Sequence, residues 1–497
     1  MELDMPLLTK IAGRRTFVLA LAAIMLAGLS AARTSTGHPP VHAAPSQGSA
    51  DPSPSQGHVS AAAPSSPLFG TLDAQLPSVS VDKQAGVSVA MFELDWSSFE
   101  PKPGQFNSAY ISGMKAFLTG FRSAGMRVTL GLGLQNPPSW ISSLPDASYI
   151  NESGDRANEA DLVYSEPVRE AAAAYLKQVA AALPLSEFWS VRLTSGGNEE
   201  MLYPAGGSYW AFSRSALSGT DLPPTMKADP FPTWRPGRSG LTRTQIDRWV
   251  NWYVGGLDDV TCWQMSTLSS LGFTGYYELV TPGSGTRPDA LAAQEQRNLP
   301  DGAVTGVGAV WDRYYAMLPN KSKVVAYVSS VADTSGDDDP CQASDESLPL
   351  ASPEMDTWSA TRWISRVAAA NGLPVGGENP GFGMPASLDS HYRDTSSHGM
   401  MADAIRQATT CKFQVFYWAH DSDFSSGIIP LSLYRKYIAR AHERLSAGHA
   451  VGIGDAVTTK PEARAGRTLD IARSIANRPG IGRKAKPCTF LISNPFR

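Results

Sequence analysis

The feature that most constrains the fold is a regular alternation of short β-rich runs with longer helical stretches between residues 67 and 446. Several of the runs are nearly continuous in apolar residues, which is typical of parallel strands that are covered on both faces. We expect eight strands, at residues 67–71, 86–94, 126–134, 188–195, 273–281, 323–331, 373–377 and 413–418.

Helical periodicity fills most of the gaps between these runs. We expect helices at residues 108–124, 165–182, 244–271, 353–371, 400–410 and 431–445. Repeated strand–helix units predict a (β/α)8 barrel, a single domain with long loops after its strands. A doubly wound open sheet is the alternative fold. Because no Gly-rich phosphate-binding fingerprint follows an early strand, its nucleotide-binding version is disfavoured.

The N-terminal residues 1–44 are typical of an export signal. Arg14 and Arg15 precede an apolar run at 17–32, and small residues suited to cleavage follow at 41–43. The arginine pair also resembles the twin-arginine export pattern. The apolar run is shorter than the roughly 20 residues that span a bilayer, so a retained membrane anchor is the weaker alternative. We expect a secreted or extracytoplasmic protein without stable membrane insertion.

Composition sets the flanks apart from the predicted barrel. Residues 45–66 are rich in Pro, Ser and Ala and predict a disordered linker, and the basic segment 447–497 predicts a disordered tail. The chain has a net charge of -4, but residues 67–448 alone carry -11. A nucleic-acid partner requires a basic face, which this acidic region does not offer. A neutral, polyhydroxylated substrate fits it better.

Carboxylates, amides and indoles follow the predicted strands, at the end of a barrel where active sites form. Hydrolysis of a glycosidic bond needs two carboxyl groups, because one protonates the leaving oxygen while the other attacks the sugar or activates water. The fourth and seventh strands face each other across an eight-stranded barrel. We therefore expect Glu199 and Glu378, which follow these strands, to meet over the central cavity. Glu200 is the alternative to Glu199.

Two sets of motifs resemble a known group of enzymes, the clan A glycoside hydrolases. The pair Asn198-Glu199 after strand four resembles the Asn-Glu signature of the clan, and Glu378 resembles its nucleophile. Residues 96–107, WSSFEPKPGQFN, are similar to the W-x-x-x-E-P-x-x-G-x-(F/Y)-(D/N) pattern of family 42 β-galactosidases. Residues 125–140 resemble the next strand of the same enzymes.

The resemblance implies a retaining β-glycosidase. In such an enzyme Glu199 is the general acid/base, Glu378 is the nucleophile and Asn198 contacts the 2-hydroxyl of the substrate. Trp418 forms part of the sugar-binding floor, and Tyr327 on strand six orients the nucleophile. Retention requires the two carboxyl groups to lie about 5 Å apart.

Other polar and aromatic residues at the strand ends are further candidates for sugar contacts. Gln135 offers an amide to hydroxyl groups, and Trp96 and Trp140 offer ring faces, although each indole is equally compatible with a packing role. One departure from the clan stands out. Many members place an arginine at the end of strand two, where this chain has Glu93 and Asp95. The departure bears on sugar specificity more than on reaction type.

No cofactor or metal is predicted. The acidic loop with Asp333 lacks the alternating oxygen ligands of a calcium loop, and the histidines lack paired ligand spacing. Pairing of the four cysteines stays open, with Cys341 to Cys411 one of the possible disulfides. The absence of a G-x-S-x-G motif argues against an esterase. The competing function is a non-catalytic carbohydrate-binding barrel at the cell surface. The identity of the sugar and the oligomeric state are not encoded in these patterns.

Overall fold

The computed structural model of the protein describes residues 67–197, 199–283, 285–336, 340–383 and 386–451. The predicted export signal (1–44), the predicted linker (45–66) and residues 452–497 of the predicted tail lie outside the described residues. Within these described ranges, no helix combines the length and the apolar character needed to cross a bilayer.

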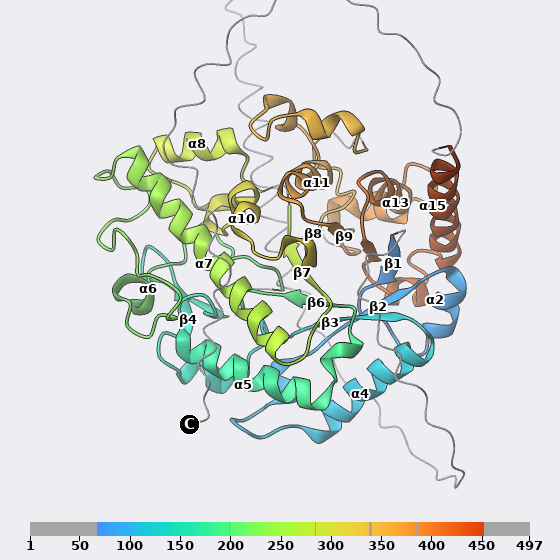
Figure 1. The fold of residues 1–497 in the computed structure, drawn as a ribbon, viewed down its shortest axis with the longest axis horizontal. Helices are drawn as coiled ribbons and strands as arrows, with labels where there is room; N and C mark the ends of the chain where they lie inside the picture. The colour runs from blue at the N-terminus through green and yellow to red at the C-terminus, as the bar shows by residue number, and fades with distance from the viewer. Residues whose placement is uncertain (1–66, 198, 284, 337–339, 384–385, 452–497) are drawn as a thin grey trace, which may run out of the picture.

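Parallel strands close into a barrel at the centre of the molecule (Figure 1). Their order around the barrel is β1-β10-β9-β8-β7-β6-β3-β2. The strands are β1 (Leu68–Thr71), β2 (Val89–Glu93), β3 (Arg127–Gly131), β6 (Ser190–Leu193), β7 (Tyr276–Thr281), β8 (Val324–Val328), β9 (Val375–Glu378) and β10 (Val415–Trp418). Each predicted run overlaps one of these strands, and the predicted (β/α)8 barrel is confirmed.

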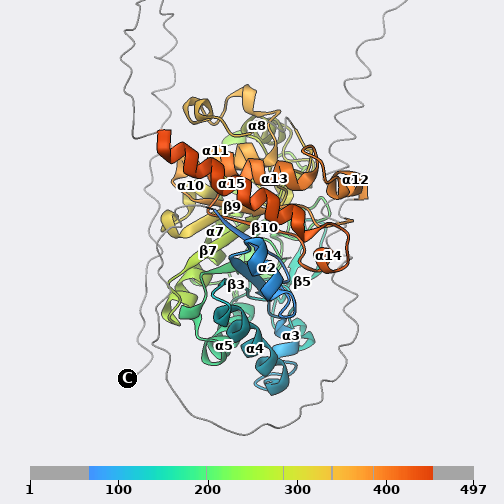
Figure 2. The same ribbon diagram turned by 90° about the vertical axis from the view of Figure 1, so that its right-hand side faces the viewer.

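Helices form a ring around the strands, as Figure 1 shows, and Figure 2 shows α15 lying beside α2. They are α2 (Val79–Ala85), α3 (Trp96–Phe99), α4 (Ser108–Ser123), α5 (Glu166–Ala182), α6 (Arg214–Ser218), α7 (Arg243–Ser270), α8 (Pro288–Gln296), α9 (Ala303–Gly306), α10 (Trp311–Met317), α11 (Ala360–Asn371), α12 (Asp389–Arg393), α13 (Met400–Thr410), α14 (Ser422–Ser425) and α15 (Leu431–Val451). Short 3-10 turns occur at η1 (Ser139–Ser143), η2 (Leu185–Glu187), η3 (Lys321–Lys323), η4 (Ala343–Ser347), η5 (Pro353–Met355) and η6 (Ala386–Leu388).

Helix boundaries follow from local capping chemistry. Thr242 and Gln245 form a capping box at the start of α7, in which each side chain bonds the backbone of the other residue. The Ser165 side chain accepts the backbone N–H of Val168 at the start of α5. The boundaries of α4, α5, α7 and α13 agree with the predicted helices to within one residue.

The fold differs from the sequence-based expectation in several places, and helices such as α2, α8 and α10 lie where none was predicted. The helix predicted from residue 353 begins at Ala360, because residues 353–355 form a 3-10 turn and Ser359 caps the helix. Helix α15 ends at Val451, past the predicted boundary at 446. The antiparallel pair β4 (Ser148–Ile150) and β5 (Arg156–Ala160) was not expected, since β5 is short and largely polar.

Alternation along the strands separates the barrel interior from the shell beneath the helices. The interior cluster includes Val325 and Tyr327 of β8 and Val415 and Tyr417 of β10. Trp418, the next residue of β10, belongs instead to the large core between strands and helices. This two-residue period decides which side chains reach the barrel mouth.

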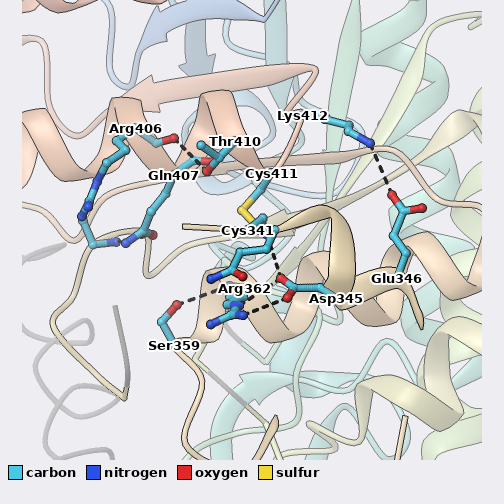
Figure 3. The surroundings of a disulfide bond; sticks show 12 residues. Cys341, Asp345, Glu346, Ser359, Arg362, Arg406, Gln407, Thr410, Cys411 and Lys412 are labelled. Carbon is cyan, nitrogen blue, oxygen red and sulfur yellow. Dashed lines mark hydrogen bonds and ion pairs between the residues drawn. A yellow bond between two sulfur atoms is a disulfide. The ribbon is translucent and has the colours of Figure 1, made fainter. Parts of the chain in front are cut away.

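A disulfide joins Cys341, in the segment after β8, to Cys411 at the end of α13, with an S–S distance of 2.00 Å (Figure 3). Beside it, the Arg362 guanidinium donates to both carboxylate oxygens of Asp345 at 2.9 and 2.8 Å. One of the cysteine pairings left open by the sequence is therefore present, and it fastens a long loop at the mouth side to an outer helix.

Candidate active site

Glu378 ends β9 with its side chain 14% exposed, and two groups hold one of its oxygens. The hydroxyl of Tyr327 donates to Oε2 at 2.5 Å. Nη2 of Arg192 donates to the same oxygen and also to the Tyr327 hydroxyl. Both partners point inward from other barrel strands, Tyr327 from β8 and Arg192 from β6. The carboxylate is therefore fixed by an ion pair and a phenolic hydrogen bond.

Glu278 of β7 is a second ion-pair partner of Arg192 and has no exposed surface. Nε of Arg192 lies 3.4 Å from Oε2 of Glu278, while Ser190 and Tyr417 donate to Oε1 at 2.7 and 3.0 Å. Burial raises the pKa of Glu278, and the Arg192 charge and these hydrogen bonds lower it. A charged residue buried this deeply requires such partners. This network links Arg192, and through it Glu378, to residues on other strands. The positions of both side chains therefore depend on the closed barrel.

The loop after β6 carries Glu199 and Glu200 and is fastened on both sides. The Tyr149 hydroxyl donates to the Ser195 carbonyl at 2.7 Å, before the glutamates. After them, Met201 N donates to the Val280 carbonyl at 3.0 Å, at the end of β7. Buried aromatic residues packed beneath this loop, including Tyr203, reinforce the second attachment. The loop is thus positioned by the ends of strands, as catalytic loops of barrels are.

The two glutamates of this loop differ in environment. Glu200 is half-buried and accepts a hydrogen bond from the Ser329 hydroxyl at 3.0 Å. Burial, followed by the charges of Glu378 and Glu199, raises the pKa of Glu200 to about 8, against the lowering effect of Ser329. Glu199 has an exposed side chain. The surrounding protein restricts the hydration of the Glu199 carboxyl and thereby raises its pKa. The charges of Asp73 and Glu378 also raise this pKa.

Glu93 and Gln135 form a hydrogen-bonded pair at the same mouth of the barrel, at the carboxyl ends of β2 and β3. Nε2 of Gln135 donates to Oε1 of Glu93 at 2.5 Å. Burial raises the pKa of Glu93 to about 8, and the charge of Glu199 acts in the same direction, whereas the Gln135 hydrogen bond lowers it. Glu93 therefore lies close enough to Glu199 for their charges to interact.

Asp73 and His420 form a second pair, just past the ends of the neighbouring strands β1 and β10. Oδ2 of Asp73 lies 2.7 Å from Nδ1 of His420. Removal from water alone would raise the pKa of Asp73, but the hydrogen bond and charge of His420 lower it. Burial alone would lower the pKa of His420, but Asp73 and Glu378 raise it. Both side chains remain accessible, with exposed fractions of 56% and 41%.

Four sequence-predicted site residues gather at this mouth: Glu199, Glu378, Tyr327 and Gln135, together with Glu200. Tyr327 faces the interior and contacts Glu378, an orientation that spacing alone had left open. Asn198 lies outside the described residues.

Two of the predicted tryptophans, Trp418 and Trp96, are fully buried in the structure. Trp418 has no exposed surface, and its ring contacts Tyr392 at 4.9 Å between centroids. Trp96 is also fully buried and stacks on Tyr175 at 5.1 Å. Trp140 is half-buried and meets the edge of Trp96, with ring centroids 6.1 Å apart. These rings pack in the shell, so Trp96 and Trp418 present no open face to a ligand.

Sequence reasoning missed Arg192 and the role of Glu278 as its buried partner. Arg192 stands between Val191 and Leu193, and Glu278 stands within the apolar run Tyr276–Thr281. A charge inside a strand that is otherwise apolar is the signal that would have found both, because the interior of a barrel tolerates charges only when they are paired. In the described part of the chain, no three His, Cys, Asp or Glu side chains are placed to hold a metal ion.

Comparison with known proteins places this geometry in context. Residues 77–183 match a family model described as Glyco_hydro_42, beta-galactosidase. No curated protein sequence matches the chain. Among solved structures, the catalytic domain of a β-amylase from Paenibacillus polymyxa aligns with a TM-score of 0.53 and 16% identity, covering 76% of this chain and 100% of that one. A β-galactosidase from the psychrophilic Marinomonas ef1 aligns with a TM-score of 0.50 and 12% identity, covering 78% and 61%.

At these identities the structural likeness concerns the fold, and the family match concerns the segment from α2 to α5. The chain is a TIM barrel, and residues 77–183 within it resemble the family 42 model.

Proposed function

We propose that the protein is a glycoside hydrolase that cleaves β-glycosidic bonds with retention of configuration, using Glu378 as nucleophile and a carboxyl group of the Glu199–Glu200 pair as acid/base. The observation that carries the proposal is the fixed carboxylate of Glu378 at the barrel mouth, bonded by Tyr327 and paired with Arg192. A nucleophile must meet the anomeric carbon in one orientation, and such contacts provide that orientation before substrate binds.

The surroundings of the two carboxyl groups suit opposite roles. Arg192 and Tyr327 are donors to Glu378, which favours a carboxylate able to attack and to stabilise a cationic transition state. Glu200 has a pKa of about 8 and therefore carries a proton at neutral pH. Two carboxyl groups whose environments differ in this way are the arrangement that acid/nucleophile catalysis requires.

The remaining polar groups at the mouth suit the hydroxyl groups of a sugar. Glu93 and Gln135 lie at the carboxyl ends of β2 and β3. Asp73 and His420 lie just past the ends of β1 and β10. Together, these amide, carboxyl and imidazole groups offer both donors and acceptors of hydrogen bonds, as recognition of a polyhydroxylated ring demands. We propose that they bind the substrate and that no cofactor takes part.

The comparisons support a galactoside as the first substrate to test. The matched family model carries the description beta-galactosidase, and one of the similar structures is a β-galactosidase. The disulfide between Cys341 and Cys411 supports an extracytoplasmic location, because such bonds persist in oxidising compartments.

A panel of aryl β-glycosides tests the proposal, beginning with the p-nitrophenyl β-galactoside. The full chain is assayed beside Glu378→Gln, with Glu443→Gln on the exposed side of α15 as a matched control. We expect turnover of at least one glycoside, a loss of roughly 10³-fold or more in Glu378→Gln, and unchanged turnover in the control. Equal turnover in Glu378→Gln contradicts the assignment. If the full chain binds sugar but neither it nor any variant turns over a glycoside, the carbohydrate-binding alternative is supported instead.

A further inference from the structure

The structure distinguishes the two glutamates after β6 by the contacts of Glu200 and by the exposure of each side chain. Glu200 reaches Ser329, whose hydroxyl donates to Oε1 at 3.0 Å. Ser329 directly follows Val328, and Val328 pairs in register with Gly377, the residue before Glu378. Ser329 and Glu378 therefore end neighbouring strands, which lie about 4.8 Å apart in a sheet. The contact with Ser329 brings the Glu200 carboxyl to the side of the mouth where Glu378 stands.

The charges around Glu199 come from several strand ends of the mouth. The charges that act on its carboxyl are those of Arg192 from β6, Asp73 after β1, Glu378 from β9 and His420 after β10. Glu93, at the end of the second strand, is in turn affected by Glu199. The Glu199 side chain is exposed, whereas Glu200 is half-buried. Glu199 is placed to accept a hydrogen bond from a sugar hydroxyl.

The backbone anchors reinforce this distinction. Ser195 N donates to the carbonyl of Glu200 itself at 3.4 Å, and the next residue, Met201, is completely buried and bonded to the end of β7. Glu199 stands one residue farther from this anchor. A group that transfers a proton must be held within a fraction of an ångström, and the anchored position satisfies that need better.

From this geometry we infer that Glu200, and not Glu199, is the acid/base residue of the barrel. The inference rests on the proposed function and deepens it. In the first step the Glu200 carboxyl gives its proton to the glycosidic oxygen as the bond from that oxygen to the anomeric carbon breaks. A Glu378 oxygen forms the new bond to that carbon, and the aglycone leaves as an alcohol. In the second step the Glu200 carboxylate takes a proton from water, whose oxygen attacks the anomeric carbon and releases Glu378.

The charges around Glu200 agree with this role. The groups that face it are Glu378 from β9, Glu199 from its own loop and Arg192 from β6, with the Ser329 hydroxyl as its hydrogen-bond donor. Two negative neighbours and burial favour the protonated acid before the first step. Once Glu378 is bonded to the sugar its charge is gone, so the same site then favours the carboxylate that must act as base.

Leaving-group dependence tests the inference. The parent protein, Glu199→Gln, Glu200→Gln and the control Glu443→Gln are compared on a 2,4-dinitrophenyl and a phenyl glycoside of the sugar that the parent cleaves. The dinitrophenolate departs without a proton and the phenolate does not. We expect Glu200→Gln to lose roughly 10²- to 10⁴-fold on the phenyl glycoside and far less on the first step of the dinitrophenyl glycoside. Added azide should accelerate Glu200→Gln and yield a glycosyl azide with retained configuration.

Glu199→Gln should instead lose activity about equally on both glycosides, mainly through a higher KM, and azide should not rescue it. If the leaving-group dependence and the azide product appear in Glu199→Gln and not in Glu200→Gln, the inference is overturned. Equal losses without azide rescue in Glu200→Gln also overturn it, because a merely structural role gives that pattern. If the parent protein cleaves no glycoside, the proposed function fails, and the inference fails with it. Thermal melts of each variant verify that the fold is retained.

Discussion

Removal of a single hydroxyl, in Tyr327→Phe, probes how strongly the barrel interior orients Glu378. The Tyr327 hydroxyl donates to Oε2 of Glu378 at 2.5 Å, and its ring has no exposed surface. A hydrogen bond to a charged group contributes about 1.5–3 kcal/mol, and each 1.4 kcal/mol is tenfold in rate, so kcat/KM should fall roughly 10- to 150-fold. The assay is steady-state hydrolysis of an aryl β-glycoside by the full chain.

The matched control for this variant is Tyr417→Phe. Tyr417 is equally buried and lies in the same interior cluster, but its hydroxyl contacts Glu278 and Thr129 and not Glu378. Both variants leave buried partners short of a hydrogen bond, so both should lose about 1–3 kcal/mol of unfolding free energy. Tyr417→Phe acts on Glu378 only through Glu278 and Arg192, so it should lose much less turnover than Tyr327→Phe. If Tyr327→Phe keeps parental kcat/KM, or if both variants lose turnover equally, the proposed orienting role of Tyr327 is refuted.

Three further perturbations test other parts of the account. Because burial raises the pKa of Glu200 to about 8 and the acid acts in its protonated form, kcat/KM should stay level below that pH and fall above it, and a profile without this decline contradicts the role. His420→Asn removes the partner of Asp73 and should raise KM roughly tenfold with little change in kcat, as measured by initial rates. Replacing both Cys341 and Cys411, 70 residues apart, by serine should lower the free energy of unfolding by about 4 kcal/mol in denaturant titrations, and an unchanged midpoint contradicts the loop-entropy argument.

The barrel could be predicted because its strands and helices have different periodicities. Runs such as 324–328 are apolar throughout, since both faces of a barrel strand are covered. The helices at 108–123 and 400–410 begin and end at local signals and match their predictions closely. The hairpin of β4 and β5 was missed because it is stabilised within a loop insertion and lacks an apolar run of its own.

The site was harder to predict because its chemistry depends on which face of a strand each residue occupies. Trp418 was predicted to form part of the sugar-binding floor. Its neighbour Tyr417 occupies the inward-facing position of the strand, so the Trp418 indole packs in the core between the strands and the helices. Arg192 was missed because it sits in an apolar strand, and its partners Glu278 and Glu378 come from strands distant in sequence. Such pairings exist only once the barrel closes, and no local pattern encodes them.

Covalent trapping of Glu378 tests the central claim most directly. A 2-deoxy-2-fluoro β-galactoside with a dinitrophenyl leaving group forms a slowly hydrolysed glycosyl–enzyme when the nucleophile of a retaining β-galactosidase attacks it. The account predicts one adduct per chain by intact mass, located on the peptide that contains Glu378 and absent in Glu378→Gln. An adduct on another residue, or hydrolysis of an unmodified glycoside to a first product of inverted configuration without any adduct, would contradict it.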